Sequence, residues 1–443
     1  MLLFIIILLL IYLYSLSNIN YTYQINENYY DIQKVVNDSF FPPIKYKIRI
    51  GIYCYCLKNG GRARITSILI NYFYKIKIFN IYLFTKIYKE KNEYFIPEDI
   101  KRIIIINNIT KVIRKYKINI LIYQLSNENE IILLNKMKNV KVIYFLHSSA
   151  FYWIYFNYTA FKLIYKAYTN SNYVLSIIPF ENNFIFKYWG IKSLLLTNFI
   201  TYDYNRVIPS DMSSKNILMI GRGNNKMKRF EIGINAMEYV FQEIPESRLI
   251  IISDNKGIEN LRYISNILNI EKKIEFVGYT STPEIYFKTT ILHLFPSLTE
   301  AFPLVLCETK IYGIPNVIIG LDYVSIAQNG TIIIYNDEPE IFGKEIIKIV
   351  NNNLFIKKLG VEARKSIKIY NNNLLLRKWI KLILSIYNGY YLKIYKKEES
   401  KKFLNKEKTI LKNQVKFLKL RLNIFKNINL TDYLNFSFIE KIK

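Results

Sequence analysis

The stretch KIRIGIYCYC, from Lys47 to Cys56, opens a pattern that recurs through most of the chain. It is a short apolar run of strand length, and the turn Asn59–Arg62 separates it from an apolar stretch of helical length, ITSILINYF. Further runs of this kind alternate with helix-length stretches, and such alternation is typical of βαβ units that build a parallel sheet. The sequence therefore predicts an α/β fold.

The strand-like runs fall into two sets, as two domains would require in a chain of 443 residues. The first set is KIRIGIYCYC, FNIYLFT, INILIYQ, VKVIYFLH, YVLSII and SLLLTN. A polar stretch from Thr201 to Lys215 follows, and the alternation restarts with NILMIG, RLIIIS, IEFVG, ILHLFPS, NVIIG and TIIIY. We expect doubly wound, Rossmann-like domains at residues 46–200 and 216–350. They should face a cleft, because open α/β sheets bind ligands outside the carboxyl ends of their strands.

Residues 1–17 contain the apolar, uncharged run MLLFIIILLLIYLYSL. As a helix this run would be roughly 24 Å long, somewhat shorter than the roughly 30 Å hydrocarbon core of a bilayer. We expect a single uncleaved membrane anchor, with a cleavable signal peptide or a buried core helix as alternatives. Four basic residues follow the run and none precedes it, which places the rest of the chain on the cytoplasmic side of the membrane. They are Lys34, Lys45, Lys47 and Arg49.

Three further segments flank the predicted domains. Residues 18–45 are polar, rich in Asn and Tyr, and predict a stem. Residues 351–390 have a helical pattern, and we expect these helices to pack back across the first domain. Residues 391–443 form a Lys-rich tail that is either solvated or, in part, a basic amphipathic helix lying on an anionic membrane.

The composition restricts the partners. A formal net charge of +28 suits an anionic partner, but heavy use of Lys together with Ile, Asn and Tyr explains the charge more simply as compositional drift. No basic motif interleaved with aromatic residues supports a nucleic-acid partner. Three scattered cysteines predict reduced thiols rather than a disulfide framework. The chain has no D-x-D triplet, so we expect neither a metal nor another cofactor.

The segment PSLTEAFPLVLCETKIYGIP, from Pro296 to Pro315, carries two carboxylates eight positions apart. Glu300 follows a strand-like run, and Glu308 lies on the helix that we expect to begin near Phe302. The backbone N–H groups at a helix start, together with the helix dipole, favour a diphosphate. Spacing alone also fits two solvated carboxylates.

The order of residues in this segment resembles the glutamate-x7-glutamate signature of family 4 glycosyltransferases, which have the two-domain GT-B fold. By that resemblance Glu308 would hold the ribose hydroxyls of a nucleotide-sugar donor, and Glu300 would lie against the donor sugar near the reacting carbon. The loop between them, where the family usually has glycines, would also line the donor. Its residues here are Ala301, Phe302, Pro303 and Leu304. Pro303 cannot donate an N–H, which is a departure from the family pattern.

Two further segments resemble that family. In ILMIGRGNNKMKRF, Gly221 and Arg222 end a strand-like run and Lys228 follows six positions after Arg222. In the family such cations neutralise the departing diphosphate, on which negative charge builds in the transition state. The spacing is one residue longer than the commonest form, so Lys226 or Arg229 is an alternative partner.

In the predicted first domain, Gly60 and Gly61 resemble the double-glycine turn that approaches the acceptor and the donor phosphate in the family. His147, in FLHSS at a strand end, occupies a place where the family often has a histidine that touches the donor sugar. A structural hydrogen bond is the alternative role for this histidine.

The resemblance implies a retaining, metal-independent hexosyltransferase. It would move a sugar from a nucleotide-diphosphate sugar to a glycan or to a membrane-linked or lipid-linked acceptor. The alternative is a catalytically inactive, glycosyltransferase-like membrane scaffold or partner subunit, which the sequence from Ala301 to Pro303 motivates.

Overall fold

The structure of the chain is a computed structural model that describes residues 46–389. Within that range it leaves out residues 59, 92, 107, 126, 149–163, 165–166, 169–170, 172, 179–180, 183–184, 186–190, 192, 224–226, 320–322, 328 and 335. The expected anchor, stem and basic tail all lie outside the described residues. Within the described range, every helix is too short or too polar to cross a membrane.

The first domain is built on a parallel seven-stranded sheet with the order β3-β2-β1-β4-β5-β6-β7. Its strands are β1 (Ile48–Tyr53), β2 (Phe79–Thr85), β3 (Lys101–Ile104), β4 (Ile120–Tyr123), β5 (Lys141–Tyr144), β6 (Tyr173–Ser176) and β7 (Leu194–Leu195). Its longer helices are α3 (Gly61–Tyr74), α4 (Ile109–Lys115) and α5 (Glu128–Asn135). The central strands β1 and β4 are almost entirely buried, as expected of a parallel sheet covered on both faces.

The second domain contains a parallel six-stranded sheet with the order β10-β9-β8-β11-β12-β13. Its strands are β8 (Asn216–Ile220), β9 (Arg248–Ile252), β10 (Ile274–Phe276), β11 (Thr290–Phe295), β12 (Asn316–Ile319) and β13 (Thr331–Ile334). Its helices are α9 (Phe230–Glu243), α10 (Asn255–Ile267), α11 (Glu284–Phe287), α12 (Leu304–Ile311), α13 (Val324–Ala327) and α14 (Pro339–Val350), with a 3₁₀ turn at Glu271–Lys273. The predicted α/β fold with two Rossmann-like domains is confirmed.

One strand departs from the sequence prediction. β3, with the sequence KRII, was not among the expected strands of the first domain, yet it pairs in parallel with β2. It is an edge strand whose residues are exposed or half-buried, so it lacks the continuous apolar run that marks its central neighbours.

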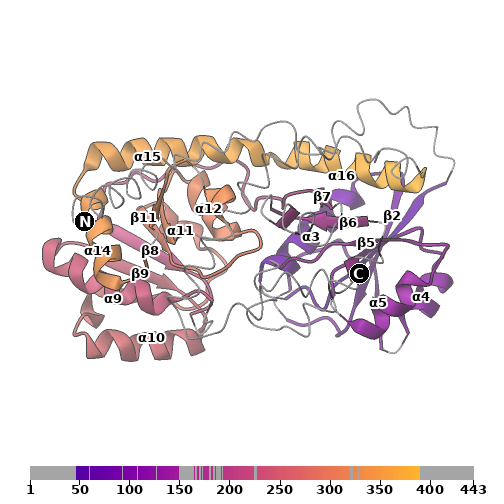
Figure 1. The fold of residues 1–443 in the computed structure, drawn as a ribbon, viewed down its shortest axis with the longest axis horizontal. Helices are drawn as coiled ribbons and strands as arrows, with labels where there is room; N and C mark the ends of the chain where they lie inside the picture. Colours follow the sequence, from indigo (N-terminus) through magenta and orange to yellow (C-terminus); the bar gives the residue numbers. More distant parts are fainter. Residues whose placement is uncertain are drawn as a thin grey trace, which may run out of the picture.

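Two helices at the end of the described chain connect the domains. α15 (Asn353–Ser366) lies along the second domain and α16 (Asn372–Tyr387) lies along the first, nearly end to end (Figure 1). On α16, the ring of Trp379 packs 5.8 Å from Phe73 and 5.3 Å from Phe145, both in the first domain. The Asn372 side chain accepts a hydrogen bond from the backbone N–H of Ile200 and donates one to its carbonyl, each 2.9 Å long.

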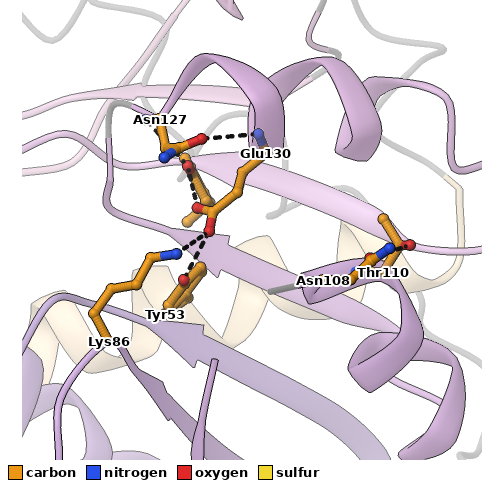
Figure 2. Close-up of polar contacts among 7 residues, drawn as sticks. Tyr53, Lys86, Asn108, Thr110, Asn127 and Glu130 are labelled. Carbon is orange, nitrogen blue, oxygen red and sulfur yellow. Dashed lines mark hydrogen bonds and ion pairs between the residues drawn. The ribbon is translucent and has the colours of Figure 1, made fainter. Parts of the chain in front are cut away.

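A buried carboxylate ties together the carboxyl ends of the strands in the first domain. Glu130, on α5, accepts hydrogen bonds of 2.9 Å from the Tyr53 and Tyr123 hydroxyls and forms an ion pair of 2.5 Å with Lys86. Figure 2 shows its contacts with Tyr53 and Lys86. The Asn127 side chain caps the helix by accepting from the backbone N–H of Glu130. Burial, reinforced by the carboxylate, raises the pKa of both tyrosines, so their hydroxyls remain protonated donors.

Candidate active site

The carboxyl ends of β8 and β11 hold an ion pair between Lys228 and Glu300. Lys228 reaches this position from the loop after β8, and Glu300 from the loop after β11, so the sheet order brings them together. Their charged atoms are 2.5 Å apart, and only 17% and 15% of the two side chains is exposed. The Lys228 ammonium also lies 5.2 Å from the centre of the Phe295 ring, a cation–π arrangement. Gly221 directly follows β8, and a Cβ added to it would stand 3.6 Å from the Lys228 methylenes Cδ and Cε.

The other predicted cations lie elsewhere. Arg222 directly follows Gly221 and is exposed, and no ion pair of its side chain occurs within the described residues. Arg229 is buried and forms an ion pair with Asp337, in the loop that precedes α14. Lys226 is outside the described residues. Of the two candidates that the structure describes, Lys228 is ion-paired with Glu300 and Arg229 with Asp337, and the choice of the second cation for a diphosphate stays a prediction.

Glu308 lies on α12 and is 2% exposed. Its Oε1 accepts an ion-paired hydrogen bond from the Arg64 guanidinium and a second hydrogen bond, 2.6 Å long, from the Thr201 hydroxyl. Arg64 belongs to α3 in the first domain, and Thr201 lies between the two sheets. Sequence reasoning missed both residues. Arg64 follows the double glycine by one helical turn, which is a weak local signal, and Thr201 has none.

The starts of α3 and α12 face each other across the domain boundary. A Cβ built on Gly61 would stand 3.3 Å from Leu304, so the first residues of the two helices are in contact distance. Gly60 adopts a φ of +84°, which a residue with a side chain rarely tolerates. The double-glycine turn thus brings the N-terminus of α3 directly against the N-terminus of α12.

The loop between the two glutamates is only partly turned toward this boundary. Phe302 is 7% exposed, and its ring packs edge-on against Tyr370 at 5.4 Å. Its side chain therefore packs into the second domain, and contact of this loop with a donor stays a prediction. Pro303 precedes the first residue of α12 and provides no side-chain cap, and Ala301 is half-buried beside them.

His147 follows β5 in the first domain, with its ring 4.2 Å from that of Phe145. Neither ring nitrogen has a hydrogen-bond partner in the described part of the chain. Burial, and secondarily the positive charge of Arg62, lowers its pKa to about 3. The imidazole is therefore neutral at physiological pH. The structural hydrogen bond considered for it is absent among the residues described here.

A second buried histidine, His293, lies on β11 in the second domain. Its Nδ1 is 2.5 Å from the Asn316 side-chain oxygen, which also accepts from the Thr309 hydroxyl at 2.9 Å. Burial lowers the pKa of His293 to about 4, so it too is neutral. Thr309 directly follows Glu308, so this network anchors the helix that carries the buried carboxylate.

The described residues contain no group of three or more His, Cys, Asp or Glu side chains arranged to hold a metal ion. The three cysteines are free thiols. The reaction without a metal stays a prediction.

Comparisons with known proteins agree with this architecture. Residues 203–370 match the family model for glycosyl transferases group 1. A stretch of 186 residues is 24% identical to an uncharacterized glycosyltransferase of Haemophilus influenzae, covering 40% of this chain and 50% of the relative. The chain thus matches about half the length of that curated relative.

Solved structures share the fold at low sequence identity. Sucrose-phosphate synthase from Thermosynechococcus elongatus is similar with a TM-score of 0.67 at 14% identity, over 77% of this chain and all of that one. Anabaena HepE in complex with UDP and glucose is similar with a TM-score of 0.63 at 14% identity, over 76% of this chain and all of that one. The chain has a GT-B-like fold. Its second half carries a glycosyl transferases group 1 domain.

Proposed function

We propose that the chain is a glycosyltransferase of family 4 that moves a sugar from a nucleotide-diphosphate sugar to a glycan or lipid-linked acceptor. One observation carries the proposal. Within the group 1 domain, the Lys228–Glu300 pair and the buried Glu308 carboxylate follow the carboxyl ends of neighbouring strands. Ligands of open α/β sheets bind at that edge. The glycosyltransferase relative and the UDP-bound HepE structure support the same conclusion.

Each group has a role in this reaction. Glu308 binds the ribose hydroxyls, and Lys228 neutralises the diphosphate as its bond to the sugar breaks. Lys228 and Glu300 neutralise each other in the present structure, so a bound diphosphate would compete with Glu300 for the ammonium. Glu300 lies against the donor sugar. The neutral His147 imidazole forms a hydrogen bond with that sugar. Retention of configuration at the sugar and independence of metals belong to the same proposal.

A second candidate function is an inactive scaffold with the same fold. Its support is that the charged groups are already satisfied within the protein: Lys228 by Glu300, and Glu308 by Arg64 and Thr201. Pro303 also supports this alternative, because proline removes one N–H donor at the start of α12. A scaffold of this kind would bind no nucleotide sugar.

The experiment begins with a panel of UDP-, GDP- and ADP-sugars, measured by thermal stabilisation of the full chain. The sugar that stabilises best is then assayed for hydrolysis and transfer with Lys228→Met and with the exposed control Lys344→Ala. Lys344 pairs with Glu340 on the surface of α14. We expect Lys228→Met to lower kcat by roughly 100-fold to 1000-fold, the effect of removing one transition-state electrostatic contact. Equal turnover in both variants would exclude the proposed role of Lys228, and no stabilisation by any sugar would favour the scaffold.

Membrane association, with the catalytic domains on the cytoplasmic side, is also proposed from the apolar residues 1–17. Fractionation of cells that express the full chain or a chain without these residues tests it. Equal recovery of both chains in the soluble fraction would contradict the proposal.

A further inference from the structure

The Glu308 carboxylate is held by groups that do not belong to its own sheet. Arg64 approaches from α3 in the first domain, 244 positions earlier in the sequence, and Thr201 from the stretch before β8. Both donate to the same oxygen, Oε1. Every hydrogen bond of Glu308 side-chain oxygens recorded among the described residues is to Oε1, so Oε2 is not used by the protein there.

Arg64 is itself fixed in direction. Its guanidinium carbon lies 5.5 Å from the centre of the Tyr94 ring, and its Nε donates a hydrogen bond of 3.4 Å to the Tyr94 hydroxyl. The Tyr94 backbone N–H in turn donates to the carbonyl of Leu57, in the loop that follows β1. The Arg64 side chain is therefore oriented by a loop residue of the first domain.

Two donors on one oxygen restrict the last torsion of a glutamate side chain. That torsion is broad in a free carboxylate, because an sp³–sp² bond has no sharp staggered minima. Once Oε1 is held from two directions, Oε2 points in one direction. A carboxylate that recognises a pair of vicinal hydroxyls needs such a fixed direction, because charged hydrogen bonds weaken steeply when misaligned.

We propose that Arg64 and Thr201 are positioning residues that fix the Glu308 carboxylate for the ribose of the donor. Ribose recognition by the second domain then depends on a contact made by the first domain. The inference rests on the proposed function, since it assumes that Glu308 binds a ribose.

The experiment measures preference for ribose rather than activity. Calorimetry with UDP, GDP and ADP first identifies the nucleoside diphosphate that the full chain binds best. Its Kd is then compared with the Kd values of its 2′-deoxy and 3′-deoxy forms. The variants are Arg64→Ala, Arg64→Lys and Thr201→Val, with Glu308→Ala defining the preference that remains without the carboxylate. Thr201→Val keeps the shape of the side chain, so it tests the contact even if Arg64→Ala loosens the domains.

The matched control is Arg262→Ala. Arg262 also pairs with a glutamate, Glu271, and lies over an aromatic ring, Phe276 at 4.5 Å. Phe276 belongs to β10, an edge strand of the second sheet that is separated from β11 by two strands.

We expect the wild type and Arg262→Ala to prefer the ribonucleotide by roughly 10-fold to 100-fold, the range of a hydrogen bond to a charged group. In Arg64→Ala and Thr201→Val the preference should fall toward that of Glu308→Ala, with partial recovery in Arg64→Lys. Undiminished preference in both variants, or tighter ribonucleotide binding in Arg64→Ala, would overturn the inference while leaving the proposed function in place. If the wild type bound none of the three nucleotides, the proposed function would fail as well.

Discussion

Removing the Glu130 carboxylate should destabilise the first domain through the groups left behind. Glu130→Ala leaves the Tyr53 and Tyr123 hydroxyls, both on fully buried side chains, without their acceptor, and leaves the Lys86 ammonium without its counter-ion. Each buried donor without a partner costs about 1–3 kcal/mol. The Lys86 side chain is 24% exposed and can turn its ammonium to water, so the lost ion pair adds little. The two hydroxyls share one carboxylate and their costs do not simply add, so we expect a loss of about 2–5 kcal/mol in the free energy of unfolding.

The assay is urea denaturation followed by circular dichroism and by tyrosine fluorescence, which report on the two domains to different extents. The control is Glu340→Ala, which breaks an exposed pair with Lys344 on α14 and should change stability by less than about 0.5 kcal/mol.

A triple variant distinguishes the stability lost through hydroxyls without partners from the stability lost through packing. Glu130→Leu combined with Tyr53→Phe and Tyr123→Phe removes the acceptor and both donors together, and the partly exposed Lys86 can turn to water. If the reasoning is right, the triple variant is considerably more stable than Glu130→Leu alone, because no buried hydroxyl lacks a partner. A triple variant as unstable as the single one would refute it.

Two further predictions concern backbone and protonation. Gly330 has a φ of +70°, and a Cβ there would lie 2.2 Å from the backbone nitrogen of Ala363, so Gly330→Ala should cost more than about 4 kcal/mol. Gly389→Ala, at a φ of +73° with open space around it, should cost only about 1–2 kcal/mol, and equal melting points would contradict the steric argument. His147 and His293, with pKa values of about 3 and about 4, should both stay neutral in the folded protein down to pH 5. The unfolded chain takes up these protons near pH 6.5, so stability should fall as pH drops from 6.5 toward 4. NMR of histidine-labelled protein checks this, and a titration midpoint near 6.5 for either ring would oppose it.

Much of the fold follows from local pattern. Parallel strands buried on both faces consist of mostly apolar runs. The segments KIRIGIYCYC and ILHLF are such runs, so they could be recognised as strands from their own residues. The edge strand β3 was missed because its half-exposed positions impose no such requirement. Glu300 and Lys228 could be assigned to one site because each follows a strand of one sheet, and strand ends of a parallel sheet meet at one edge. Their ion pair was not predicted.

Other features of the site were decided only in three dimensions. The engagement of Arg229 by Asp337, the packing of Phe302 on Tyr370, and the Glu308 contacts with residues of the first domain and the linker join parts of the chain that are far apart in sequence.

The sequence by itself determined the two sheets and the edge at which charged side chains gather, because hydrophobic periodicity and strand ends are properties of neighbouring residues. Only the tertiary structure decided which oxygen of Glu308 is held, and by which domain. A contact between helices of separate domains leaves no periodic trace along the chain, since it depends on how the domains dock.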